Sequence, residues 1–164
     1  MTTPPLFVAN TVLSAAQMNK IGMWKISTTS LSGVTTNISN CFSSDYTNYR
    51  VICQNLNGGS GTTRLLTLRF RTTSDDTTAS YNGGTFGTYA AGTTTQFAFG
   101  GATSATLSAL SAQPSGSAAG GFSIDIFTPN AASGTTYTGS GFMYQSDLAS
   151  YVARSFSGNM TTAT

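Results

Sequence analysis

From residue 22 onward, apolar and polar side chains alternate along short runs that are separated by glycine-containing stretches. The clearest run is TRLLTLRFR, residues 63–71, in which Leu and Phe alternate with Thr and Arg. Because successive side chains of a strand point to opposite faces, this period of two predicts strands buried on one side. About eight to ten such short strands fit the chain, which predicts an all-β, jelly-roll-like antiparallel sandwich.

The pattern assigns strands and turns by residue range. The predicted strands comprise residues 23–30, 34–39, 48–56, 63–71, 85–90, 94–100, 105–110, 121–127, 136–145 and a region around 151–156. Turns are expected at Gly33, 57–61, 82–84, 100–101 and 111–120, because glycine tolerates backbone conformations that other residues avoid. In the run 121–127, parity predicts that Phe122, Ile124 and Ile126 point inward.

The N-terminal residues 1–21 have a different character. Ser14 followed by Gln17 matches a capping box and predicts a short helix, which an extended arm containing Pro4 and Pro5 precedes. Such a helix either covers an open end of the domain or anchors it to a neighbouring subunit. The chain is thus divided into an arm and short helix, residues 1–21, and a β-sandwich domain, residues 22–164.

Composition explains how these strands meet water. The chain contains 29 Thr, 22 Ser and 18 Gly in 164 residues, and only 7% of its residues are charged. Threonine is β-branched, so it favours strands, and its hydroxyl faces water without a charge. The 10 Phe, 7 Tyr and 1 Trp favour a folded domain over a disordered linker.

The absences exclude most catalytic chemistry. The sequence has no Glu and no His, so no imidazole base and no Ser-His-Asp relay can form. The two cysteines, Cys41 and Cys53, cannot build a four-thiolate zinc site and are expected to be free thiols at hydrophobic positions. A net charge of +2 gives no broad field for nucleic acid. We therefore predict a protein that is not an enzyme, with no catalytic, metal-binding or cofactor-binding residues and no cofactor.

Local clusters of charge have structural interpretations that we prefer. Asp75 and Asp76 are adjacent, so on an extended chain they diverge, and a turn is favoured over a weak calcium site. Arg64, Arg69 and Arg71 lie along one predicted strand, where a solvated β face is favoured over an anionic ligand.

Two further features are weighed in the same way. Asn37 and Asn159 begin glycosylation-type sequons, which matter only in a secretory pathway. Trp24 and scattered tyrosines would suit a sugar-binding platform, but large aromatic side chains are more often core residues.

No apolar stretch approaches the roughly 20 residues that a spanning helix needs, so no membrane span is predicted. The N-terminus has no basic start followed by a continuous apolar segment, so it does not match a secretory signal. The sequence is therefore expected to be made in the cytoplasm of its host.

Three passages resemble a known family. LFVANTVLSAAQMN resembles the lead-in of many phage tail-fibre and virion proteins. GMWKIST followed by NCFSSDYTNYRVICQNLNG is similar to small β domains of phage structural proteins, particularly of cyanophages. In those domains a Phe-Ser-x-x-Tyr-x-x-Tyr-Arg segment precedes a core strand, and the matching positions are Phe42, Ser43, Tyr46, Tyr49 and Arg50. LLTLRFRTT, GFSIDIF and SGFMYQS then follow the strand order of that family.

The resemblance implies a non-enzymatic virion structural protein, either a tail-fibre or appendage subunit or a capsid decoration protein on the particle surface. Its implied partners are other virion proteins, further copies of itself (as a trimer, by preference) and a host surface glycan. Members of the family continue into a glycine-containing closing strand pair, whereas this sequence ends at NMTTAT. By this resemblance, residues 22–164 are expected either to lack those closing strands or to receive them from elsewhere. The alternative is a carbohydrate-binding module of the adhesin type.

Overall fold

The computed structural model describes residues 23, 25–31, 33, 35–57, 64–71, 77, 78, 80–89, 92–110, 120–130, 134–146 and 148–161. It forms two compact units, Met1–Tyr46 and Thr47–Thr164, which are taken separately below. The short helix expected within residues 1–21 lies outside the described residues, and so do most of the turn 57–61 and the loop 111–119.

The described residues of the first unit form neither strand nor helix. The strands expected at 23–30 and 34–39 are therefore wrong for the part of those runs that the structure describes. Most side chains there are exposed, including Met23, Leu31 and Ile38. A strand is stabilised by pairing and by burying one face. In these runs, Ser and Thr side chains alternate as they would in a strand, but they provide no apolar face that could be buried.

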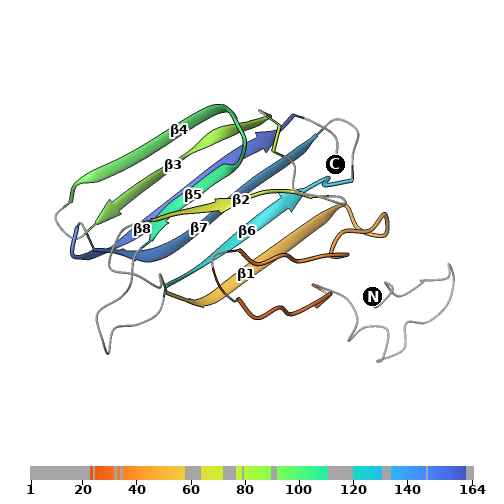
Figure 1. Ribbon diagram of the computed structural model, residues 1–164, viewed down its shortest axis with the longest axis horizontal. Helices are drawn as coiled ribbons and strands as arrows, with labels where there is room; N and C mark the ends of the chain where they lie inside the picture. Colours follow the sequence, from red (N-terminus) through yellow and green to blue (C-terminus); the bar gives the residue numbers. More distant parts are fainter. Residues whose placement is uncertain are drawn as a thin grey trace, which may run out of the picture. The chain divides into compact units, whose positions relative to one another are not determined.

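The second unit contains eight strands within its described residues, and all of their pairings are antiparallel (Figure 1). They are β1 (Asn48–Leu56), β2 (Arg64–Leu68), β3 (Tyr81–Tyr89), β4 (Thr94–Ala102), β5 (Ala105–Leu110), β6 (Gly120–Phe127), β7 (Thr135–Gln145) and β8 (Ser150–Met160). Six of them form one sheet in the order β1-β6-β7-β8-β3-β4, and β2 pairs with β5 in a second. The prediction of an all-β, antiparallel sandwich is confirmed.

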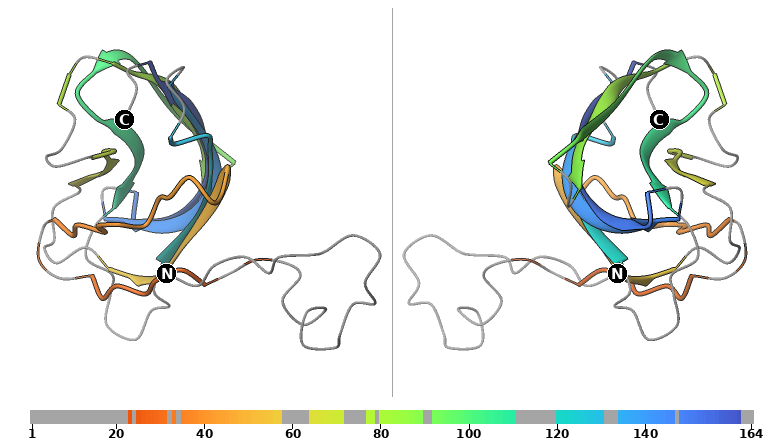
Figure 2. Two further views of the ribbon diagram at one scale, coloured as in Figure 1. Left: turned by 90° about the vertical axis from the view of Figure 1, so that its right-hand side faces the viewer. Right: turned by 90° about the vertical axis from the view of Figure 1, so that its left-hand side faces the viewer.

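The two sheets form the layers of the sandwich. The six-stranded sheet is curved, and β2 and β5 lie on its concave side (Figure 2). Strand β5 contacts β3, β4, β7 and β8 of the large sheet. The small sheet therefore lies over the β3, β4, β7 and β8 part of the concave face, and the opposite, convex face is left without a second layer of described strands.

Side chains from both layers form the core. Leu107 of β5 is 2% exposed, and Ile124 of β6 and Met143 of β7 are 1% and 0% exposed. The expected inward direction of Phe122, Ile124 and Ile126 is confirmed, although Phe122 is only half-buried. Near the end of β2, the ring of Phe70 stacks on Tyr81, with centroids 6.4 Å apart.

Glycines on the concave face lie beneath large side chains of neighbouring strands. A Cβ on Gly139 would lie 2.5 Å from the Phe156 ring, and one on Gly87 would lie 2.7 Å from Cδ of Arg154. Each glycine is paired with the residue that covers it, Gly139 with Phe156 and Gly87 with Arg154. The high glycine content thus serves packing across the sheet as well as turns.

Two turn predictions are wrong, and close packing accounts for the first of them. Strand β3 runs through Gly83 and Gly84, and β4 runs through Gly100 and Gly101. A Cβ on Gly84 would lie 2.8 Å from the carbonyl oxygen of Phe97 on the paired strand. Close approach between backbones, not a reversal of the chain, accounts for glycine at this position.

Candidate recognition surface

The strand pairings fix which side chains share the convex face. Directly paired residues of an antiparallel sheet point to the same side, so the pairings can be followed from strand to strand. One row across the sheet joins Ile52, Ser123, Ser140, Ser155 and Phe86. It crosses five strands, from β1 to β3. The three serines, named here the serine row, lie in the middle of this line.

Large apolar side chains flank the serine row and are exposed. Ile52 is 59% exposed at one end and Phe86 is 52% exposed at the other. The next row along the strands contains Phe142, which is 47% exposed, between its partners Gly121 and Ala153. Apolar side chains this exposed, set among small polar residues on one face, are a common mark of an interaction site.

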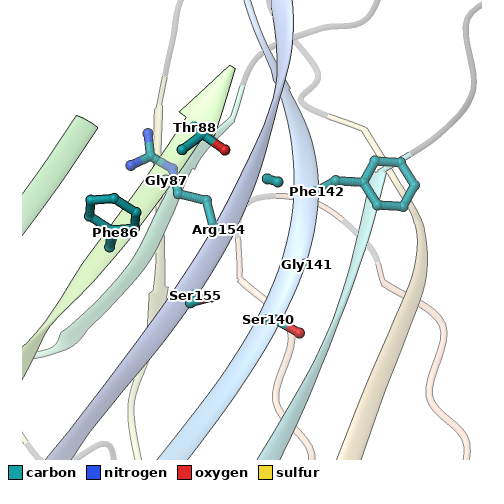
Figure 3. Close-up of a pocket in the computed structure, with 9 residues that line it drawn as sticks. Phe86, Gly87, Thr88, Ser140, Gly141, Phe142, Arg154 and Ser155 are labelled. Carbon is teal, nitrogen blue, oxygen red and sulfur yellow. The ribbon is translucent and has the colours of Figure 1, made fainter. Parts of the chain in front are cut away.

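The small neighbours of Phe142 leave a hollow on each side of its ring. One hollow extends towards Phe86, and Figure 3 shows Phe86 and Phe142 on opposite sides of it, with Ser140 and Ser155 between them. The other extends towards Ile52. Each has a volume of about 450 Å³. The surface therefore alternates between apolar ridges and hollows lined partly by hydroxyl groups.

Aromatic rings continue from Phe142 along β7 and β8. The Phe142 and Tyr151 ring centroids are 6.1 Å apart, and Tyr151 meets Tyr144 edge-on with centroids 5.4 Å apart. Phe142 and Tyr144 are two residues apart on β7, so both point to the convex face. Phe86, Phe142, Tyr151 and Tyr144 are named here the aromatic track.

Among the strand residues of this face that the structure describes, charge is confined to one ion pair. Arg50 of β1 donates from Nε to Oδ1 of Asp125 at 2.6 Å and from a terminal nitrogen to Oδ2 at 2.7 Å. The hydrogen bond from Arg50 lowers the pKa of the Asp125 carboxyl, and the same bond raises the pKa of Arg50. In this bidentate ion pair the charges of Arg50 and Asp125 offset each other. The serine row and the aromatic track therefore lie in a region without net charge.

The arginines singled out in the sequence lie elsewhere. Arg64 belongs to β2 of the small sheet, and Arg69 follows that strand and donates from Nε to the carbonyl oxygen of Thr103 at 3.1 Å. Strand β2 ends at Leu68, three residues before the expected end at Arg71. Arg64 and Arg69 are exposed and Arg71 is half-buried, and only Arg64 of the three lies on β2.

The remaining candidates are partly outside the described residues. Asp75, Asp76 and Trp24 are in that category, so their interpretation stays a prediction. Asn159 lies on β8 within the convex face, and Asn37 is exposed in the first unit. Within the second unit, Asn159 lies four residues beyond Ser155 of the serine row along β8.

Both cysteines are free thiols. Cys53 of β1 is half-buried and packs against the buried pair Leu56 and Met143, which confirms its hydrophobic position. Cys41 is half-buried in the first unit, where its Sγ donates to the carbonyl oxygen of Ile38 at 3.6 Å. Burial raises the pKa of both thiols above 9.0, so they are protonated and unreactive near neutral pH.

One buried cation was missed by the sequence analysis. Arg154 of β8 is 2% exposed and donates to Oε1 of Gln145 at 2.6 Å, while its guanidinium carbon lies 5.1 Å from the Phe97 ring centroid. The signal was present, because Arg154 shares its parity with Val152 and Phe156, which point into the core. By parity the Arg154 side chain points to the concave side, although the residue also lines the hollow between Phe86 and Phe142.

Comparison with known protein families, curated proteins and solved structures gives no match for this chain. Within the described residues, no three Cys or Asp side chains gather where they would hold a metal ion. The same part of the chain contains no helix long and apolar enough to cross a membrane.

Proposed function

We propose that this protein is a non-enzymatic structural protein of a bacteriophage virion, displayed on the particle surface. It would serve as a tail-fibre or appendage subunit or as a capsid decoration protein. The observation that supports this role is the convex face, a broad sheet surface that combines uncharged hydroxyl groups with exposed apolar side chains. Such a surface keeps its hydration at any ionic strength, which suits a protein that works outside cells. The family resemblance supports the same role.

In this proposal, residues 1–21 fix the domain to the particle and the β-sandwich projects from it. The test is mass spectrometry of purified virions from the phage that encodes the sequence, with the full chain and with a chain lacking residues 1–21. The full chain should be found in several copies per particle. The shortened chain should fold, as judged by circular dichroism, and be absent from virions. Normal incorporation of the shortened chain would disprove the anchor, and absence of the full chain would disprove the virion role.

A second candidate function is a carbohydrate-binding module of the adhesin type that acts away from any particle. The aromatic track favours it, because exposed rings beside hydroxyl groups suit sugars as well as display. The same mass spectrometry separates the two functions, since a free module would be missing from purified particles.

A further inference from the structure

We propose that the convex face binds an uncharged polysaccharide, whose chain lies across the strands over the serine row and the aromatic track. This inference rests on the proposed function only in requiring that the convex face be exposed. Four features of the surface identify the class of ligand. They are the absence of net charge, the exposed rings beside hydroxyl groups, the spacing of those rings, and the small polar residues at the centre.

The charge of the surface selects a neutral ligand. Among the strand residues of the convex face that the structure describes, Arg50 is the only cation, and it donates two hydrogen bonds to the carboxylate of Asp125. Nucleic acids and acidic polysaccharides need several accessible cations to offset their own charge. An uncharged polymer needs none, so it fits this face better than an anionic one.

The chemistry of the surface matches a sugar ring. A pyranose has an apolar face of C–H groups and a rim of hydroxyl groups. The rings of Phe86 and Phe142 offer apolar faces for stacking, and Ser140 and Ser155 between them offer hydroxyl groups that both donate and accept. Phe86 and Phe142 lie on strands separated by β8, a span of roughly 10 Å across the sheet. This length suits a chain of linked sugars more than a single one.

A protein partner fits the same surface less well. The centres of protein interfaces are enriched in contiguous apolar and aromatic side chains and depleted in Ser and Ala. Here the centre is occupied by Ser123, Ser140, Ser155 and Ala153. The rings that contact one another, Phe142, Tyr151 and Tyr144, lie to one side of the serine row. A second copy of this chain is therefore the less favoured occupant, and the experiment below includes an outcome that identifies it.

The test is a glycan array that displays neutral and acidic polysaccharides, probed with the full-length protein and with variants. Phe86→Ala and Phe142→Ala remove one ring each, and Phe127→Ala is the matched control, because Phe127 is a 36%-exposed phenylalanine on the same face, away from the serine row. Ser155→Gln is a further variant, which fills the hollow between the two rings without removing either. Circular dichroism and sedimentation of every variant check folding and association state.

We expect the wild-type protein to bind at least one neutral glycan, and to show no preference for any acidic glycan over the neutral ones. Phe86→Ala, Phe142→Ala and Ser155→Gln should each weaken that binding by about tenfold, and Phe127→Ala should leave it unchanged. The proposal is overturned if no neutral glycan is bound, if the control loses as much binding as the ring variants, or if the ring variants only dissociate self-associated protein. Each of these results leaves the virion test above unaffected, so the two proposals can fail separately.

Discussion

At Gly139 the fold depends on the absence of a single methyl group. The Phe156 ring of β8 lies over this glycine of β7, and the carbonyl oxygen of Ser123 approaches it as well. A side chain at this position would have to displace a buried ring and a paired backbone at once. Interiors packed to crystal-like density accommodate such an insertion only by distorting their surroundings.

We therefore predict that Gly139→Ala lowers the free energy of unfolding by about 1–3 kcal/mol, through overpacking. The matched control is Gly100→Ala on β4, where an added Cβ would meet only Oδ1 of Asn82, at an ordinary contact distance of 3.5 Å. Urea unfolding followed by circular dichroism measures both variants. Equal stability of Gly139→Ala and Gly100→Ala would contradict this account of the glycines.

At the scale of the elements, one buried side chain connects three strands of the large sheet. Arg154 of β8 donates to Gln145 of β7 and to the carbonyl oxygen of Thr95 on β4, the latter at 3.5 Å. Removing an acceptor from a buried guanidinium leaves a charge that neither water nor protein compensates fully. The cost should exceed that of replacing both partners with apolar side chains.

Gln145→Leu should accordingly lower the free energy of unfolding by about 1.5–3 kcal/mol, the range for a hydrogen bond to a charged group. The double variant Gln145→Leu with Arg154→Met should be more stable than Gln145→Leu alone, because the charge leaves together with its acceptor. Chemical denaturation of the wild type, of Gln145→Leu, of Arg154→Met and of the double variant completes the double-mutant cycle. A double variant that loses the sum of the two single effects would show that the residues do not act as a pair.

The sequence predicted some elements closely and others poorly, for identifiable reasons. The run NYRVICQNL forms β1 and ATLSAL forms β5 with the expected ends. Thr47 and Asn57 on either side of β1, and Ser104 before β5, belong to no strand. By contrast, Gly83 and Gly84 suggested a turn but lie inside β3. Glycine occurs both where the chain reverses and where another strand approaches closely, and here the second reason applies. That neighbour belongs to another part of the chain, so local sequence cannot distinguish the two.

The residue types of the recognition surface could be predicted from the sequence, but the way they line up across the sheet could not. The alternating pattern indicates which side of each strand meets water. With Phe122, Ile124 and Ile126 predicted to point inward, the residues between them, Ser123 and Asp125, point outward. The serine row, however, exists only because five strands are aligned in one register. Register is set by pairing between segments far apart in the sequence, and no single run carries that information.

At the scale of the whole molecule, the scarcity of titratable groups shapes the response to pH. There is no His or Glu in the chain. In the second unit, the hydrogen bond from Arg50 lowers the pKa of Asp125 below 3.8, whereas burial raises the pKa of Tyr137 well above 10.0. These shifts act at opposite ends of the pH scale, far from neutrality.

We predict that the melting temperature is constant between about pH 5 and pH 7, where no ordinary Asp, Cys or Tyr titrates. The contribution of Asp125 is present above its unfolded pKa and is lost as the pH falls through its lower folded pKa. The contribution of Tyr137 is present below its unfolded pKa and declines as the pH rises towards its folded pKa. Calorimetry across the pH range measures the profile, and Asp125→Asn should reduce the loss in acid while leaving the plateau flat. A sloping plateau would contradict the prediction.

The last prediction concerns β4, which ends the strand order of the large sheet. This edge strand has nine residues, Thr94–Ala102, and contains neither a charged residue nor proline. Lysine, proline and inward-pointing charges are the usual protection of such an edge against pairing with another chain. An unprotected strand of this length is therefore expected to be covered by a further copy of the protein.

Full-length protein should accordingly self-associate at micromolar concentration in sedimentation equilibrium, with a trimer favoured by the resemblance to virion proteins. Ala98→Lys places a charge on the exposed edge strand and should shift the protein towards the monomer, because like charges on paired strands repel. Ser157→Lys is the matched control, since Ser157 lies in the same row as Ala98 but on β8, which has a partner strand on each side. A monomeric wild-type protein, or the same shift in both variants, would show that the β4 edge is not where the copies meet.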